Sequence, residues 1–250
     1  MADRTFAATL AKGLSVLGAF ESRRGGMNLP ELGAATGFDR ATVRRLVLTL
    51  EAEGYLERDG RGYRLAARVL SLAGGYLETL DIGRRVQPVL RHAADALGLE
   101  VALATLDRGR AVYVDRAAPA DARVTMGFTV GSSLPLLSTA VGRMLLARSG
   151  QDVLEAVLAA GVARHTEATV TDPDRLRAEI AACGADECAF VSGEFEPGAA
   201  GLAVPVGALG DRAFTLATTA TINRLAEPSA RDAVLDVLRH AAMSIGRIGG

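Results

Sequence analysis

Apolar positions in the first third of the chain recur with the period of a helix. Over residues 8–20 they fall on one side, which predicts a first helix that contributes to a small core. A second stripe, spaced i, i+3, i+4 and i+7, predicts another amphipathic helix that follows Asp39 and carries the stripe over residues 43–50. The expected core positions of the two helices are Leu10, Leu14, Leu17 and Phe20, followed by Val43, Leu46, Val47 and Leu50.

Capping signals predict a short helix between these two. Asn28 and Glu31 have the spacing of a capping box, and Gly37 suits the left-handed conformation that ends a helix. Asp39 then caps the helix that carries the second stripe. Two short helices joined by a glycine turn are typical of a helix-turn-helix, which reads the major groove of DNA with its second helix.

The outward face of that second helix carries arginines and small residues. Arginine can bond guanine or phosphate, and small side chains allow a close approach to the groove. A Gly-rich turn joins two alternating runs over residues 54–65 and predicts a β-hairpin wing with further arginines. The alternative is that these arginines form an ordinary solvated face. The candidate DNA-contacting residues are Arg40, Ala41, Thr42, Arg44, Arg45, Thr49, Arg58 and Arg61.

Beyond the wing, the pattern predicts a linker helix and then an α+β domain. The linker, residues 66–83, has an exposed apolar edge that suits a dimer seam. Short β-rich runs, inserted helices and further strands then predict a mainly antiparallel sheet over residues 84–250, so residues 1–65 form the DNA-binding domain. The expected strands are 101–106, 111–116, 124–130, 185–191, 202–206 and 213–219, and the expected helices are 84–97, 139–147, 152–160, 174–183 and 229–248.

Composition agrees with two domains of different charge. The chain has 250 residues, 49% of them hydrophobic, enough for more than one core. Residues 1–85 hold 13 basic and 10 acidic residues, net +3, whereas the remainder holds 15 and 19, net −4. The first part therefore suits a phosphate-facing role. Lys12 is the single lysine, which indicates a GC-rich genome, so the arginine count is not itself evidence of DNA binding.

Other classes of function find little support in the motifs. His92, His165 and His240 lie far apart and fit no catalytic or metal motif, and no nucleotide-binding loop is present, so we expect no enzyme, cofactor or metal. Cys183 and Cys188 leave a thiol-based redox sensor as an alternative, and a small-molecule enzyme as a weaker one. Because no signal peptide or membrane span is apparent, we expect a cytoplasmic protein that does not enter a membrane.

The chain as a whole resembles the IclR-type bacterial transcription regulators. The first signature is Leu29–Leu32 with Thr36-Gly37, then residues 41–50 and 54–57. The second is Gly131 with Leu134–Leu136, then residues 139–147, 194–198 and 202–206. The resemblance implies a winged helix, a linker helix and a sensing domain related to GAF and PAS folds. The sequence of residues 130–143 is most similar to those of the family branch that regulates protocatechuate and 4-hydroxybenzoate catabolism.

This resemblance also implies an effector pocket and partners. The free N–H groups expected around Thr139, where a helix opens, suit a carboxylate. Val191 and Gly201 stand where relatives that bind small polar acids often have aspartate and cysteine, which favours a larger or aromatic acid. The partners implied are operator DNA, a carboxylate effector and a second copy of the chain, with a dimer of dimers as the alternative. The effector residues implied are Arg123, Met126, Phe128, Thr139, Ala140, Val141, Val191, Gly201, Thr219 and Thr221.

Overall fold

The chain folds into two compact units, Met1–Tyr76 and Leu77–Gly250. The structure is a computed structural model that describes residues 5–21, 25–79, 82–120, 129–209 and 212–247. The boundary between the units falls inside the segment predicted as the linker, where helix α4 (Arg68–Thr79) is found. None of the described helices is both long and apolar enough to cross a membrane.

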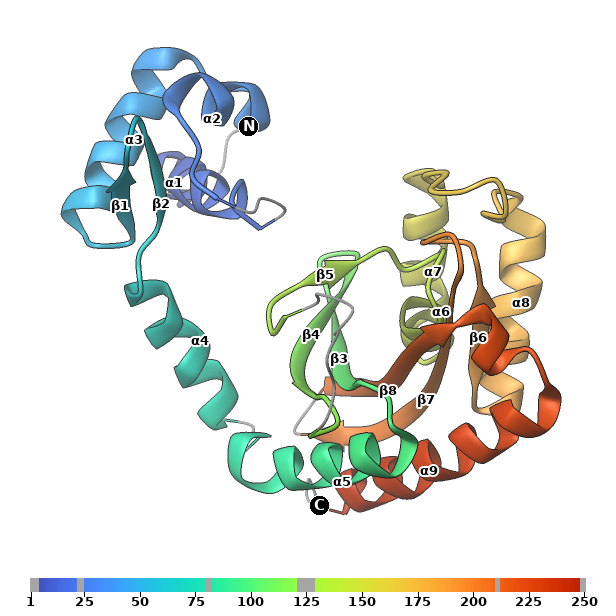
Figure 1. Cartoon of the computed structure of the whole chain (residues 1–250). Coiled ribbons are helices and arrows are strands. Elements are labelled where there is room, and N and C mark those ends of the chain that lie inside the picture. The colour runs from blue at the N-terminus through green and yellow to red at the C-terminus, as the bar shows by residue number, and fades with distance from the viewer. Residues whose placement is uncertain (1–4, 22–24, 80–81, 121–128, 210–211, 248–250) are drawn as a thin grey trace. The chain divides into compact units, whose positions relative to one another are not determined.

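The first unit is a three-helix cluster followed by a hairpin (Figure 1). The hairpin strands pair antiparallel, and Met27 adds a bridge to Tyr63 beside them. The predicted helix-turn-helix and wing are therefore confirmed. The elements are α1 (Ala8–Gly18), α2 (Leu29–Thr36), α3 (Arg40–Ala52), β1 (Leu56–Asp59) and β2 (Gly62–Leu65).

The predicted capping residues fix both ends of the turn between α2 and α3. The Asn28 side chain accepts the Glu31 N–H at 3.0 Å, and the Glu31 carboxylate accepts the Asn28 N–H at 2.9 Å. Gly37 ends α2 with φ of 73°. Asp39 then accepts the N–H groups of Ala41 and Thr42, both at 3.0 Å. Local hydrogen bonds therefore set the angle at which α3 leaves the turn.

The core of this unit corrects one prediction about α1. Val16 and Phe20 are buried, whereas Leu10 and Leu14 remain 64% and 58% exposed. The prediction that these two leucines belong to the core is wrong, because they line an apolar groove left open beside α3 and α4. We call this surface the α1–α4 groove. Its apolar lining residues are Leu10, Leu14, Leu17, Leu46, Leu50, Tyr55 and Leu72.

The second unit is built on a six-stranded antiparallel sheet with the order β5-β4-β3-β8-β7-β6. The α+β prediction is confirmed, although β6 begins later than predicted because helix α8 continues through Asp186. Most of the predicted strand 124–130 lies outside the described residues. The strands are β3 (Val101–Asp107), β4 (Arg110–Ala117), β5 (Ser133–Leu134), β6 (Ala189–Ser192), β7 (Ala199–Leu209) and β8 (Arg212–Thr221).

Helices cover both faces of this sheet (Figure 1). Helices α5 and α9 pack on one face, while α6 packs on the other with α8 against it. Most of the buried strand residues on the α6 side of the sheet are alanines, which lets the helix lie close to the sheet. The helices are η1 (Ile82–Val86), α5 (Gln87–Leu97), α6 (Ala140–Ala147), α7 (Gln151–Ala159), α8 (Pro173–Asp186), η2 (Ile222–Leu225) and α9 (Pro228–Gly246).

Two glycines hold the start of α6 in place. A Cβ on Gly201 of β7 would lie 3.3 Å from the Ala140 Cβ, so this strand and the helix approach closely. A Cβ on Gly142 would lie 2.4 Å from the Cα and O atoms of Leu136, which no side chain tolerates. The segment that precedes α6 therefore folds back onto the first turn of the helix.

Candidate functional site

The arginines of α3 form an exposed surface in the first unit. Arg40, Arg44 and Arg45 are all exposed, as is Ala41, while the opposite face of the helix is buried in the core. The guanidinium groups therefore remain accessible to a polyanion. This arrangement is the one required for a recognition helix.

The two threonines predicted to contact DNA use their hydroxyls within the helix. The Thr42 hydroxyl donates to the Asp39 carboxylate at 2.6 Å, and that bond is the main reason the pKa of this carboxyl is lowered. The Thr49 hydroxyl donates to the Arg45 carbonyl at 3.0 Å, and Thr49 borders the α1–α4 groove. Both residues thus lie on the flanks of the arginine face.

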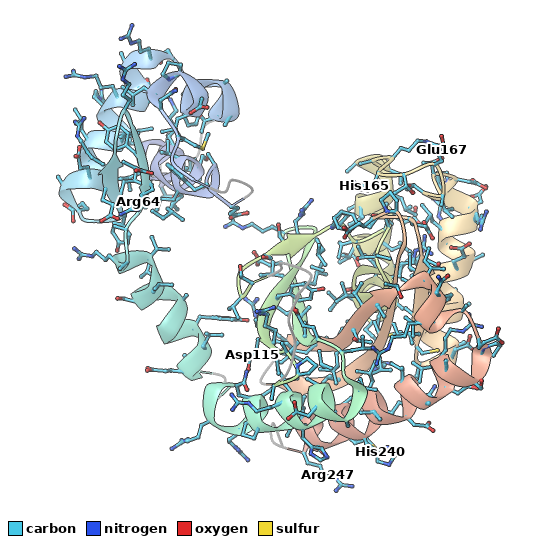
Figure 2. All side chains as sticks on the ribbon, viewed as in Figure 1. Arg64, Asp115, His165, Glu167, His240 and Arg247 are labelled. Atoms are coloured by element: carbon cyan, nitrogen blue, oxygen red, sulfur yellow. The ribbon has the colours of Figure 1, made fainter. Side chains whose placement is uncertain are left out.

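The wing arginines differ in their surroundings. Arg58 pairs with Glu51 at 3.1 Å and lies over the Tyr63 ring at 5.0 Å from its centroid. Arg64, labelled in Figure 2, pairs with Glu57 at 2.7 Å. Arg61 is exposed at the tip of the hairpin. Among the predicted wing residues, Arg61 is therefore better placed than Arg58 to reach a phosphate.

A cavity opens in the second unit between the first turn of α6 and the sheet. The space between its walls, counted together with the open mouth, amounts to about 480 Å³. The loop between β6 and β7 forms one wall. The lining residues are Tyr113, Leu134, Ser138–Val141, Val191, Gly193–Glu196, Ala199–Gly201 and Ala217–Thr219.

Most of the described residues predicted for the pocket meet in this cavity. Thr139, Ala140, Val141, Val191, Gly201 and Thr219 all line it. Thr221 does not, because it lies two residues further along β8, about 7 Å away, and is exposed. Arg123, Met126 and Phe128 lie outside the described residues.

The polar end of the cavity is the start of α6. The Thr139 hydroxyl caps the helix by accepting the Gly142 N–H at 3.1 Å, and it donates to the Pro135 carbonyl at 2.6 Å. Helix geometry leaves the N–H groups of Ala140 and Val141 without an intrahelical acceptor. Ser138, the residue before Thr139, is only 2% exposed, and its buried hydroxyl has no hydrogen-bond partner among the described residues. A buried hydroxyl in this position lacks an acceptor that a ligand can supply.

Several lining residues were missed by the sequence analysis. Ser138 precedes the capping residue, and Tyr113 alternates toward the α6 face of β4, but neither position is marked as part of a site in the sequence. Burial raises the pKa of the Tyr113 hydroxyl, with the charge of Glu100 adding to the effect. Glu194 and Phe195 appeared only within the family signature. Only the register of the sheet and the loop after β6 bring these residues together.

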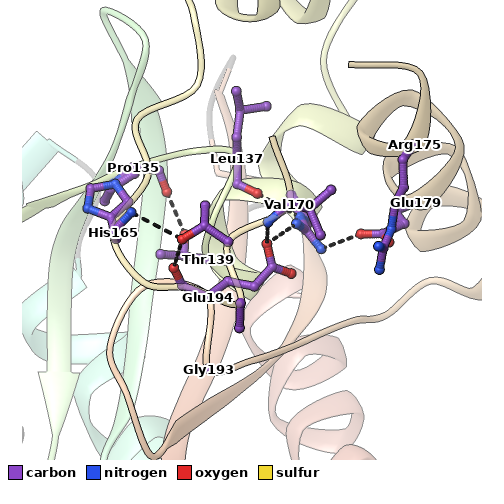
Figure 3. Close-up of polar contacts among 12 residues, drawn as sticks. Pro135, Leu137, Thr139, His165, Val170, Arg175, Glu179, Gly193 and Glu194 are labelled. Atoms are coloured by element: carbon purple, nitrogen blue, oxygen red, sulfur yellow. Dashed lines mark hydrogen bonds and ion pairs between the residues drawn. The ribbon is translucent and has the colours of Figure 1, made fainter. Parts of the chain in front are cut away.

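A chain of charged side chains runs from the buried Glu194 to the exposed Arg175 (Figure 3). The Arg143 guanidinium, 3% exposed, donates to the Leu137 carbonyl, to Glu179 and to Glu194, each at 2.7 Å. Arg175 pairs with Glu179 at 2.7 Å from the outer side. The signs alternate along the chain, so the charges compensate one another.

The two cysteines do not have the properties of redox sensors. Cys183 is buried, and burial raises its pKa to about 11. Burial also raises the pKa of Cys188. Reactive cysteines instead have a lowered pKa, which keeps the thiolate populated near neutral pH. Among the described residues, no group of three potential ligands is arranged to hold a metal ion.

A helix-turn-helix with an exposed arginine face, together with a separate unit that contains a cavity at the start of a helix, defines a ligand-responsive DNA-binding regulator. Residues 9–60 match the family described as IclR helix-turn-helix domain. Residues 74–247 match the family described as bacterial transcriptional regulator IclR C-terminal. The chain therefore belongs to the IclR family of bacterial transcriptional regulators, and it is a regulator rather than an enzyme.

Named relatives include regulators of aromatic catabolism. The chain is 34% identical over 205 residues to the Pca regulon regulatory protein of Pseudomonas putida, covering 82% of this chain and 70% of the relative. It is 30% identical over 243 residues to the p-hydroxybenzoate hydroxylase transcriptional activator of Acinetobacter baylyi, covering 95% of this chain and 90% of the relative. The predicted placement in the aromatic-acid branch is supported by these two names.

Solved structures of the family have the same fold. An IclR transcriptional regulator from Silicibacter sp. TM1040 superposes with a TM-score of 0.86 at 31% identity, covering 97% of this chain and 96% of that one. An IclR homologue from Microbacterium hydrocarbonoxydans, complexed with 4-hydroxybenzoate, gives a TM-score of 0.79 at 27% identity, covering 96% of this chain and 98% of that one.

Proposed function

We propose that this protein controls an operon for the catabolism of an aromatic acid, and that a small aromatic carboxylic acid binds in the cavity as its effector. The observation that carries the proposal is the buried Ser138 hydroxyl, which lacks an acceptor beside the open N–H groups of α6. A carboxylate supplies acceptors for all of these donors. The 4-hydroxybenzoate bound by the Microbacterium homologue supports this class of ligand.

The rest of the cavity suits an aromatic ring with a second polar group. Val191, Ala217 and Leu134 supply apolar walls, and Thr219 offers a hydroxyl on β8. Gly201 allows α6 to approach the sheet and does not simply enlarge the cavity. The roles of Arg123, Met126 and Phe128 stay predictions.

Calorimetric titration with 4-hydroxybenzoate, protocatechuate, glyoxylate and pyruvate tests this proposal. We expect the two aromatic acids to bind more tightly than the two small acids. Ser138→Ala should weaken aromatic-acid binding about tenfold or more, because a hydrogen bond to a charged group is lost. Ser149→Ala, which removes a hydroxyl bonded to the Leu145 carbonyl, is the matched control. Tighter binding of glyoxylate, or equal effects of the two variants, would contradict the proposal.

For DNA, we propose that Arg40, Ala41, Thr42, Arg44, Arg45 and Thr49 approach the major groove, and that Arg58 and Arg61 approach phosphates. Arg45→Ala should weaken operator binding by about 1–3 kcal/mol without changing effector affinity. Arg212→Ala, at an exposed arginine of the second unit, serves as the control. Unchanged gel-shift affinity of the Arg45 variant would remove this residue from the reading surface.

We further propose that the protein acts in the cytoplasm as a homodimer on a roughly palindromic operator, with a dimer of dimers as the larger assembly. The exposed leucines of the α1–α4 groove support self-association through the first unit. Effector binding then changes operator affinity only through its different affinity for two arrangements of the dimer. Such coupling amounts to about 1–3 kcal/mol in typical regulators.

A further inference from the structure

The carboxylate of Glu194 poses a problem for an anionic ligand. Glu194 is 7% exposed and is one of the residues that line the cavity, so its negative charge lies close to the space that a carboxylic acid would occupy. An uncompensated negative charge there would repel such a ligand strongly, because a buried site screens charges poorly. Glu196, also in the lining, is exposed to solvent and is therefore screened.

Arg143 compensates this charge from behind the wall. The guanidinium is not part of the lining, yet it donates to Glu194 Oε2 at 2.7 Å. The Val170 N–H donates to the same oxygen at 3.0 Å, so the carboxylate is held from two directions. Figure 3 shows Glu194 and Glu179 on opposite sides of one guanidinium group. Glu179 is the outer carboxylate, since its side chain is 31% exposed and also pairs with Arg175.

We propose that Arg143 is a specificity-determining residue that neutralises Glu194 and so allows the cavity to accept an anionic effector. This inference rests on the proposed binding of an aromatic carboxylate in the cavity. Arg143 does not touch the ligand, and it acts through the charge of Glu194. It also holds the Leu137 carbonyl at 2.7 Å, which fixes the residue next to Ser138.

Two double variants of equal charge test the proposal. Both remove Arg143 together with one of its carboxylate partners, so neither variant leaves Glu179 and Glu194 together without a counter-ion. In Arg143→Met with Glu194→Gln, the wall facing the cavity becomes neutral. In Arg143→Met with Glu179→Gln, Glu194 keeps its charge and loses its counter-ion. The probes are 4-hydroxybenzoate and its neutral analogue 4-hydroxybenzamide, titrated into the full-length protein.

The proposal predicts that binding affinity is lost in one double variant only, and for one of the two probes only. In the Glu179 double variant, the affinity for 4-hydroxybenzoate should fall about tenfold or more relative to that for 4-hydroxybenzamide. In the Glu194 double variant, the ratio of the two affinities should stay near that of the wild type.

The outcomes separate this inference from the proposed function. If both probes weaken equally in both variants, Arg143 only supports the structure and the inference fails, while the proposed function stands. If the benzoate-selective loss occurs in the Glu194 double variant instead, the inference also fails. If the wild type binds neither probe, the proposed function fails, and the inference fails with it.

Glu194→Gln alone, which leaves Arg143 paired with Glu179, should bind 4-hydroxybenzoate at least as tightly as the wild type.

Discussion

At the scale of single residues, Asp115 on β4 is a buried carboxylate with one oxygen, Oδ2, that has no hydrogen-bond partner among the described residues. The other oxygen accepts the Arg116 N–H at 2.8 Å. Burial is the main cause of the raised pKa of this carboxyl, and the bonds from Arg116 and Gln87 oppose it only in part. Ionised Asp115 therefore costs the folded state stability.

The sign of this effect gives a pH prediction. The pKa of the Asp115 carboxyl is higher in the folded state than in the unfolded state. The loss of folding stability is therefore absent below about pH 4 and complete above the folded-state pKa. Asp115→Asn keeps an oxygen acceptor for Arg116, so its stability relative to the wild type should rise as the pH rises from about 4 to 7. Urea unfolding at several pH values measures this difference, with the exposed Asp107→Asn as a control for loss of charge. A constant or falling difference would contradict the prediction.

At the scale of elements, the first turn of α6 depends on Gly142. A Cβ there would meet the backbone of Leu136, whereas a Cβ on Gly184 of α8 would make an ordinary contact at 3.6 Å with the Ala147 carbonyl oxygen. Gly142→Ala should therefore destabilise the protein by at least about 2 kcal/mol and weaken effector binding. Gly184→Ala should be neutral or stabilising by up to about 1 kcal/mol. Thermal unfolding of the two variants measures this contrast, and equal melting temperatures would refute it.

Helix α4 contains an adjacent pair of glycines, Gly74 and Gly75, with open space around both. Each glycine inside a helix costs about 1 kcal/mol relative to alanine. Replacing both by alanine should strengthen α4, seen as slower amide exchange, and should change the effect of 4-hydroxybenzoate on operator affinity. Ala73→Gly should act in the opposite direction. If exchange slows but the effector response is identical to that of the wild type, the flexibility of α4 has no part in signalling.

The elements also show which features a sequence can predict. Asn28, Gly37 and Asp39 act on neighbours within a few residues, so the ends of α2 and α3 followed from local spacing. Leu10 and Leu14 gave the same apolar signal as true core residues, because periodicity marks an apolar face but not what covers it. Ser138 and Glu194 meet at the cavity only through the packing of α6 against β7, which no short motif records.

At the scale of the whole molecule, the α1–α4 groove bears on assembly. Leu14 and Leu72 line the groove and are 58% and 62% exposed, so charged substitutions there should spare the fold of the single chain. If the proposed dimer forms through this groove, Leu14→Glu with Leu72→Glu should convert it to a monomer and sharply weaken operator binding, since two linked half-sites are lost. Light scattering after gel filtration measures the mass.

Leu70→Glu is the matched control for this assembly test. Leu70 lies on the same helix and is 71% exposed, but it is not part of the groove lining. The control should remain dimeric. A wild-type protein that is monomeric at micromolar concentration, or a double variant that stays dimeric, would exclude the groove as the seam.

The start of α6 has a consequence for how such a receptor can change over time. Its donors at Ala140 and Val141 belong to the peptide backbone, and no substitution other than proline deletes a peptide N–H group. In the proposed binding mode, substitutions at Val191 or Thr219 can therefore alter which acid fits, while the hydrogen bonds to the acid group persist. A receptor of this design can evolve to sense an acid of another metabolic pathway through substitutions in the cavity lining alone.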